Sequence, residues 1–245
     1  MEREPTDHRA PSRGSSLRPA HDGLVGAAAD LLLGGDCPGC HDPGWGLCRD
    51  CATEVSRSRP RPCHRPRVAG PIWAAGEYDG IVPTLINAAK ERRRWDAIAP
   101  LSRLLAGAVA GLHDDSDRGN AFSGGPLVLV PAPSSPATVR KRGLDVTAAV
   151  ADGAVGWLRR VGLPARRRSV LSHRRRVADQ TGLDAHERRA NLDHALVARS
   201  APRGTIVIVD DVVTTGSTLA EAIRELEAAG STVAGAAVVA DHRLR

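Results

Sequence analysis

Apolar and polar positions along the chain form blocks that predict buried strands followed by helices. Two short aliphatic runs, 127–130 (LVLV) and 205–209 (TIVIV), are typical of strands buried on both faces, as in a parallel sheet. Apolar residues at helical spacing follow each run, over about 145–158 and again from 219 onward. This order of strand, loop and helix predicts an α/β fold with a parallel sheet flanked by helices.

The pattern also predicts elements before the first of these strands. Residues 70–78 (GPIWAAGEY) are expected to form a strand or hairpin edge, and residues 81–92 a helix. A second helix is predicted at 97–112. Its inward positions are Leu101, Leu104, Leu105 and Val109.

The amino-terminal residues divide the chain into unequal parts. Residues 1–21 are polar and rich in proline, so we expect them to be disordered. A short helix is predicted at 22–35, and an Arg- and Pro-rich linker at 57–66. We therefore expect a tail at 1–21, a small module with its linker at 22–66, and the α/β domain at 67–245.

Composition narrows the class of protein. Hydrophobic residues make up 42% of the chain but aromatic residues only 2%, so the core must consist of Val, Leu, Ile and Ala. No apolar run approaches the roughly 18 residues of a membrane helix. The polar start of the chain has no signal-peptide core. We expect a cytoplasmic protein without membrane insertion.

Positive charge is concentrated in one stretch of a chain whose formal net charge is +6. Between positions 139 and 176, eleven basic residues accompany two acidic ones, Asp145 and Asp152. Such a stretch attracts polyanions, either pyrophosphate or nucleic acid, and we predict weak, salt-sensitive binding to single-stranded DNA. The alternative is a set of solvated helix and loop faces.

Four cysteines form two CxxC pairs, seven residues apart, in a segment rich in Gly and Pro. They are Cys37, Cys40, Cys48 and Cys51. Four thiolates on so short a segment predict a structural Zn²⁺ site of the knuckle or ribbon kind, since the metal can order a segment this small. A redox pair or two disulfides are the alternatives. The fifth cysteine, Cys63, stands beside His64, and either is a candidate substitute ligand.

The residues after the strand at 205–209 carry the most specific chemistry. Two adjacent carboxylates, Asp210 and Asp211, come at the strand's carboxyl end, where open α/β sheets bind ligands. A loop with four hydroxyls then leads into a helix, and its residues are Val212, Val213, Thr214, Thr215, Gly216, Ser217 and Thr218. Backbone N–H groups, hydroxyls and a helix N-terminus suit a phosphate. Helix capping is the alternative, although it needs one hydroxyl.

A second loop of this kind follows the strand at 127–130. It is a rigid turn that leads into cations, and its candidate anion-binding residues are Ala132, Pro133, Ser134, Ser135, Arg140 and Arg142. Two such loops fit a ligand with a phosphate at one end and a pyrophosphate at the other. Ionised carboxylates accept hydrogen bonds from hydroxyls, so Asp210 and Asp211 fit a sugar diol between them. Phosphoribosyl pyrophosphate (PRPP) has this constitution.

The run from Val209 to Thr218 resembles the PRPP signature of the phosphoribosyltransferases, an apolar strand, two acidic residues and TTGxT. Over most of residues 37 to 240 the chain resembles the ComF (GntX-like) family. The residues that carry this resemblance are the paired CxxC, Tyr78 to Gly80, Lys90, Val130 to Pro133, Arg142-Gly143, and Gln180 to Asn191. The resemblance implies a type I phosphoribosyltransferase-like (Rossmann-like) domain behind a zinc-binding module, with Mg²⁺ bound together with PRPP.

The resemblance also implies an activity. The expected reaction transfers a phosphoribosyl group from PRPP to a nitrogen nucleophile, a nucleobase or an amine, with release of pyrophosphate. Asp210 and Asp211 would be the catalytic pair, holding the ribose hydroxyls and supplying negative potential. The alternative is a PRPP- or nucleotide-binding accessory protein without transferase activity, which works with the DNA-uptake machinery in competence.

Overall fold

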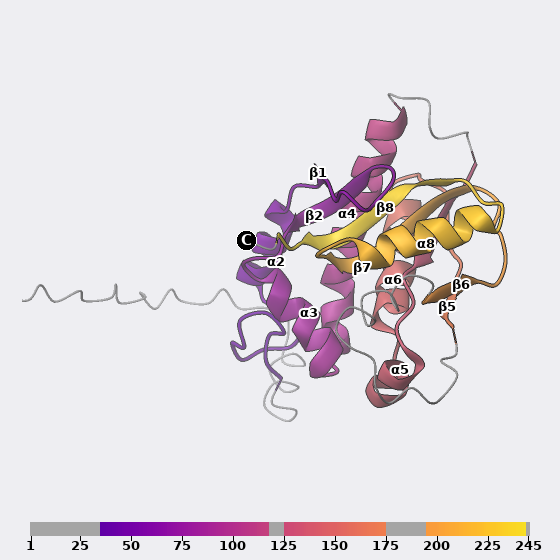
Figure 1. Ribbon diagram of the computed structural model, residues 1–245. Helices are drawn as coiled ribbons and strands as arrows, with labels where there is room; N and C mark the ends of the chain where they lie inside the picture. Colours follow the sequence, from indigo (N-terminus) through magenta and orange to yellow (C-terminus); the bar gives the residue numbers. More distant parts are fainter. Residues whose placement is uncertain (1–34, 118–124, 175–194, 244–245) are drawn as a thin grey trace, which may run out of the picture.

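The computed structural model describes residues 35–117, 125–174 and 195–243 (Figure 1). The expected tail at 1–21 lies outside these residues, as does the helix predicted at 22–35 apart from Gly35. The motif from Gln180 to Asn191 also lies outside them.

A six-stranded sheet forms the centre of the domain. Its strands, in spatial order, are β1 (Arg61–Cys63), β2 (Ile72–Glu77), β8 (Val233–Asp241), β7 (Thr205–Val213), β3 (Leu127–Pro131) and β4 (Ala165–Arg167). All neighbouring strands are parallel except β1 and β2, which are antiparallel. The mostly parallel sheet that the aliphatic runs predict is therefore confirmed.

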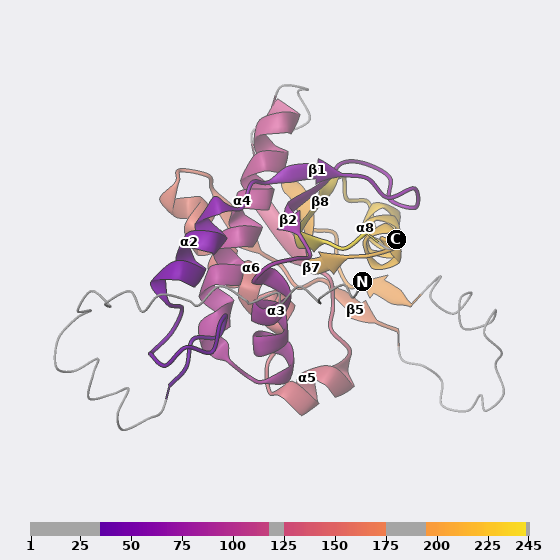
Figure 2. The ribbon, with the colours of Figure 1, turned by 90° about the vertical axis from the view of Figure 1, so that its left-hand side faces the viewer.

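Helices cover both faces of the sheet. The helices are α2 (Arg49–Arg57), α3 (Val82–Glu91), α4 (Ile98–Asp117) with a preceding 3-10 turn η1 (Trp95–Ala97), α5 (Pro136–Arg142), α6 (Val146–Arg160) and α8 (Ser217–Ala228). Figure 2 shows α4 and α6 on one side of β7 and β8, and α8 on the other. A two-stranded hairpin, β5 (Leu171–His173) with β6 (Leu196–Ala198), packs on the α8 side. The domain thus has three layers.

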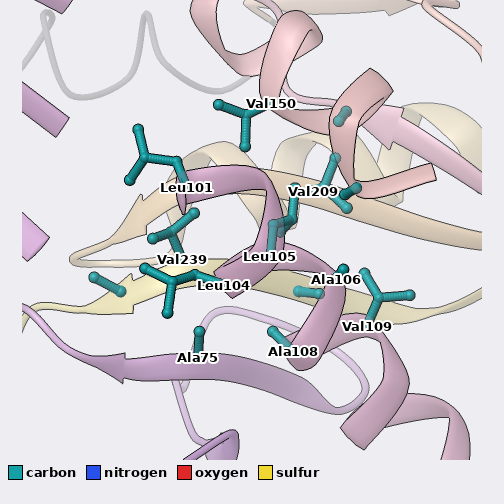
Figure 3. Close-up of a cluster of buried hydrophobic side chains, with 14 of the residues drawn as sticks. Ala75, Leu101, Leu104, Leu105, Ala106, Ala108, Val109, Val150, Val209 and Val239 are labelled. Carbon is teal, nitrogen blue, oxygen red and sulfur yellow. The ribbon is translucent and has the colours of Figure 1, made fainter. Parts of the chain in front are cut away.

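The strands are buried on both faces, which is why their sequences are continuously apolar. In β7, Val207 and Val209 join the core on the α4 side, while Ile206 and Ile208 join the core on the α8 side. Figure 3 shows the first of these cores, in which α4 packs against β7, β8 and α6. The predicted inward residues of α4 are all buried: Leu101, Leu104, Leu105 and Val109.

Several elements differ from the sequence prediction. Strand β7 continues to Val213, so the acidic pair lies within the strand instead of after it. The expected linker at 57–66 contains the edge strand β1, which β2 supports through backbone hydrogen bonds. Helix α4 continues to Asp117, beyond its predicted end at 112. Across the ranges that the structure describes, no helix combines the length and apolar character needed to cross a membrane.

Candidate functional site

The two loops that the sequence singles out lie side by side at the carboxyl edge of the sheet. Strands β3 and β7 are parallel neighbours, with Pro131 opposite Val209, and the Ala132 N–H donates to the Val209 carbonyl at 2.8 Å. From β3 the chain continues through α6 to β4, whereas from β7 it continues through α8 to β8 on the other side. The space between the two loops is therefore a topological switch point, where α/β sheets bind ligands.

The loop after β7 leaves its hydroxyls available for a ligand. Gly216 is the N-cap residue of α8, with φ of 80°, and it has no side chain of its own to cap the helix. Thr214, Thr215 and Thr218 are exposed, and the Thr215 and Ser217 hydroxyls lie 3.0 Å apart. The Thr215 hydroxyl accepts from the N–H of Ser217, the first residue of α8, at 3.4 Å, so the capping alternative accounts for one hydroxyl of the loop. The positive end of the α8 dipole faces the same loop.

The acidic pair is enclosed at the end of β7. Asp211 is buried and Asp210 half-buried, and the Asp211 N–H donates to Asp210 Oδ1 at 2.9 Å. Burial raises the pKa of Asp210 well above its usual range, and the neighbouring Asp211 carboxylate raises it further. The Lys90 ammonium, from the last turn of α3, contacts Asp211 Oδ2 and offsets part of this repulsion.

The loop after β3 uses its hydroxyls for its own structure. Ser135 caps α5 by accepting from the Thr138 N–H at 3.1 Å. Ser134 donates to Asp145 Oδ1 at 3.1 Å, and Asp145 in turn caps α6. His173 of the hairpin lies with Nε2 2.8 Å from the Pro133 carbonyl oxygen. This loop is therefore held rigidly from several sides.

The cations of the basic stretch do not form one surface. Arg140 and Arg142 end the short helix α5, which follows the loop after β3, and Arg142 bonds to Glu91 of α3 at 2.7 Å. Arg159 and Arg160 end α6, whose 15 residues run from the carboxyl edge of the sheet back to its amino edge. The stretch therefore splits between two edges of the domain. The predicted cations Arg175 and Arg176 lie outside the described residues.

One residue of this site carries no sequence signal. Arg65, in the segment expected to be a linker, is buried, and its guanidinium donates to the backbone carbonyls of Val213 and Thr214. It also bonds to the carboxylate of Asp241, at the end of β8. An Arg- and Pro-rich sequence gives no indication that one of its arginines is buried behind a loop 149 positions further along the chain. The sequence singles out Lys90 only through the family resemblance, and gives no indication that its partner is Asp211.

The four cysteines of the two CxxC pairs come together. Their sulfur atoms all lie within 4.8 Å of one another, and the sulfurs of Cys40 and Cys48 are 3.6 Å apart. A tetrahedral Zn²⁺ with Zn–S bonds of about 2.3 Å requires sulfurs about 3.8 Å apart, so the cluster fits this metal. Burial raises the pKa of the Cys37 thiol, but N–H groups of Cys48, Cys40 and Gly39 outweigh it and lower the pKa to about 7.

The fifth cysteine, Cys63, lies outside this cluster. Cys63 lies on β1, and burial, followed by the nearby Asp241 carboxylate, raises the pKa of its thiol to about 11. Among the described residues, the group whose side chains are close enough to share a metal consists of the four paired cysteines.

The cysteine cluster is fixed to the main domain. Cys37, Cys51 and Val55 belong to the same buried core as α3 and α4. Glu54 of α2 accepts from the N–H of Ile81, the N-cap residue of α3, at 2.8 Å. Contacts of the cysteine segment therefore reach the helix that carries Lys90.

Comparison with known proteins finds a family model that matches the carboxyl-terminal part of the chain. Residues 143–245 match the family model described as phosphoribosyl transferase domain. No curated protein matches the sequence.

Two solved structures are similar to the chain at low identity. One is a hypoxanthine phosphoribosyltransferase from Staphylococcus aureus, at 17% identity over 59% of this chain and 62% of that chain, with a TM-score of 0.28. The other is an adenine phosphoribosyltransferase from Leishmania tarentolae, at 13% identity over 60% of this chain and 74% of that chain, with a TM-score of 0.26. The chain thus spans less than two thirds of the first structure's length, and scores this low carry no argument about substrate.

The family match covers the acidic pair and the whole hydroxyl loop after β7. With the three-layer α/β architecture, it confirms the expected phosphoribosyltransferase-like fold. Residues 143–245 are therefore similar to the phosphoribosyl transferase domain.

Proposed function

We propose that this protein binds PRPP with Mg²⁺ between the loops after β3 and β7, and transfers the phosphoribosyl group to a nitrogen nucleophile. The observation that carries the proposal is the hydroxyl loop, in which the N-cap residue of α8 is a glycine, beside the buried Asp211 and half-buried Asp210 at the switch point. A phosphate dianion brings no hydrogen-bond donors, so the position of these acceptor oxygens beside a phosphate cradle suits a ligand that brings hydroxyl donors of its own.

Each part of the crevice has a role in this proposal. The N–H groups and hydroxyls of residues 214–218 bind the 5-phosphate. Asp210 and Asp211 accept hydrogen bonds from the ribose hydroxyls. The rigid loop at 132–135, with Arg140 or Arg142 beside it, meets the pyrophosphate. Carboxylate oxygens are ligands suited to Mg²⁺, which when bound neutralises pyrophosphate charge and is held largely by substrate oxygens and water.

The proposed reaction proceeds by substitution at the anomeric carbon. The bond to pyrophosphate breaks and pyrophosphate leaves with the electron pair, while the acceptor nitrogen forms the new bond and then loses a proton. Positive charge develops on the ribose between leaving group and acceptor, and the carboxylates of Asp210 and Asp211 stabilise it electrostatically. The crevice contributes mainly positioning and electrostatics.

The finer assignments are part of the same proposal. The cysteine cluster ahead of a phosphoribosyltransferase domain supports membership of the ComF family, with a role in competence or DNA use. The acceptor is a nucleobase or an amine. We further propose that the cluster binds a structural Zn²⁺, and that the protein works in the cytoplasm.

The test is release of pyrophosphate from PRPP and Mg²⁺ by the full chain, with purines, pyrimidines and amines offered as acceptors. We expect at least one acceptor to support release, and the rate to fall at least about tenfold in Asp210→Asn with Asp211→Asn, given the strength of hydrogen bonds to charged groups. Binding of PRPP without release for any acceptor would instead support the accessory-protein alternative. Absence of PRPP binding would contradict both.

A further inference from the structure

We infer that Arg65 is a positioning residue for the phosphate-binding loop, which it holds from behind in the conformation that binds the 5-phosphate. The inference rests on the proposed function, because it assigns the loop after β7 to that phosphate. Arg65 itself lies outside the residues that the proposal places in contact with PRPP. It acts through the backbone of Val213 and Thr214.

The guanidinium of Arg65 gathers acceptors from three parts of the chain. Nε donates to the Thr214 carbonyl, and one terminal nitrogen donates to the carbonyls of Val213 and His242, each at 3.3 Å. The other terminal nitrogen donates to the His64 carbonyl at 2.8 Å. A planar guanidinium with five N–H donors is suited to holding several backbone carbonyls at fixed angles, whereas an ammonium is not.

These bonds determine where two backbone N–H groups point. In a trans peptide the C=O and N–H groups point in opposite directions, and no cis peptide occurs among the described residues. Because Arg65 binds the Val213 and Thr214 carbonyls, the N–H groups of Thr214 and Thr215 point away from it. The His242 N–H also donates to the Val213 carbonyl, at 2.9 Å, so the sheet holds that peptide as well. The Thr214 carbonyl is held by Arg65, and without Arg65 the peptide between Thr214 and Thr215 could rotate and turn this carbonyl toward the phosphate.

Arg65 is itself fixed by charge. Its partner Asp241 has a fully buried side chain, to which Arg61 also donates at 3.2 Å. An unpaired buried charge is strongly unfavourable, so the pair keeps Arg65 in place. Arg61 also donates to Asp241, and its other hydrogen-bond partner is Glu77, at 3.0 Å. Neither partner belongs to the loop after β7.

Close packing joins the same segment to the loop. A Cβ at Gly216 would lie 3.0 Å from the Arg65 Cβ and 2.8 Å from Val68 Cγ2. The Arg65 segment and the first residue of the α8 cap are therefore in direct contact. This contact explains why the loop has its glycine at this position.

The test uses Arg65→Met, which removes the hydrogen-bond donors to the loop together with one positive charge. The control is Arg61→Met, which also removes one positive charge and one partner of Asp241, but at a residue that does not bond to the loop. Calorimetry measures the affinity of each full-length variant for PRPP, ribose 5-phosphate and inorganic pyrophosphate, all with Mg²⁺. We expect Arg65→Met to weaken PRPP and ribose 5-phosphate by about tenfold or more, the effect of losing one charged hydrogen bond. Pyrophosphate affinity should stay within about twofold in both variants, because pyrophosphate binds at the other loop.

Arg65→Lys keeps the positive charge, and it is the variant to compare with the wild type if Arg65→Met does not fold. It should bind ribose 5-phosphate more weakly than the wild type, since one ammonium cannot reproduce the fork of bonds. Hydrogen exchange on the unliganded proteins should show faster exchange at residues 213–217 in the Arg65 variants than in Arg61→Met.

The outcomes separate the two claims. Wild-type protein that binds neither PRPP nor ribose 5-phosphate would contradict the proposed function. If the wild type binds them, and folded Arg65 variants bind equally well or lose no more than Arg61→Met does, the positioning role is wrong. Equal losses for ribose 5-phosphate and pyrophosphate would also contradict it, because they would indicate a general loosening of the domain.

Discussion

Asp210 illustrates how one residue of the crevice opposes stability. Because burial and the Asp211 carboxylate raise its pKa in the folded protein, folded Asp210 retains a proton at pH values where the unfolded chain has lost it. The free energy of unfolding must therefore fall as pH rises from the unfolded pKa of about 3.9 through the raised folded pKa.

Asp210→Asn should remove this part of the pH dependence. We expect the variant to be more stable than the wild type at neutral pH, and the difference to shrink as pH is lowered below about 4, where Asp210 of the wild type becomes protonated in the unfolded state as well. Thermal unfolding across this range measures it. Parallel curves for the two proteins would show that Asp210 titrates normally.

Gly216 offers a second test with a matched control. Gly216→Ala places a Cβ against Val68 and Arg65 in a residue whose φ is 80°. Gly143 has a φ of 79° but nothing within 4 Å of its Cβ position. Gly143→Ala should cost about 1–2 kcal/mol of unfolding free energy for left-handed strain alone, and Gly216→Ala about 1–3 kcal/mol more for crowding. Denaturant unfolding measures the free energy of unfolding of both variants. Equal losses of stability in the two would mean that the loop is not packed on the Arg65 segment.

At the scale of elements, the cysteine cluster is expected to hold one Zn²⁺ per chain. Metal analysis of the protein purified without added zinc should find it. Cys51→Ser should lose the metal and lower the melting temperature, because Cys51 is also part of the α3–α4 core. Cys63→Ser should keep it, since Cys63 lies outside the cluster. Metal-free protein with two disulfides, or zinc loss in Cys63→Ser, would contradict the assignment.

The elements differ in how well the sequence predicts them. Strands β3 and β7 are buried aliphatic runs, and α4 and α8 show regular apolar spacing, so local pattern is enough to place them. Strand β8 (VAGAAVVAD) is rich in small residues and has weak intrinsic strand preference; its long pairing with β7 and β2 stabilises it. Strands β1 (RPC) and β4 (ARR) are short and polar, and are held by pairing with β2 and β3 respectively.

The same distinction applies to the candidate site. Asp210, Asp211 and the hydroxyl loop are contiguous, so their spacing alone indicates a ligand. Arg65 and Lys90 come to this loop and its acidic pair from distant segments through tertiary packing. Nothing in their local sequence distinguishes them from surface cations, which is why only the structure assigns them partners.

At the scale of the whole molecule, the described cations that end α5 and α6 lie at opposite edges of the sheet. Single-stranded DNA should bind weakly, with affinity that falls as salt is raised. Arg159→Ala with Arg160→Ala should weaken DNA binding and leave PRPP binding unchanged, because these residues end α6 at the amino edge. Arg140→Ala with Arg142→Ala should weaken both. Each lost phosphate contact should reduce the salt slope by about one, and DNA affinity independent of salt would contradict this prediction.

The cysteine segment and the loop after β7 are connected through one stretch of the chain. The segment from the cysteine cluster runs through α2 and β1 to Arg65, which binds the loop after β7 and the end of β8. The segment that carries the cysteine cluster is therefore continuous with the segment that contacts the loop after β7.

The central claim is that the loop after β7 and its acidic pair form a PRPP site. The most direct measurement is calorimetric titration of the full-length protein with PRPP and Mg²⁺, alongside Asp210→Asn with Asp211→Asn. We predict one PRPP per chain in the wild type, and at least about tenfold weaker binding in a double variant that remains folded, since each charged hydrogen bond contributes about 1.5–3 kcal/mol. Equal affinities in the two proteins, or no binding to the wild type, would contradict the account.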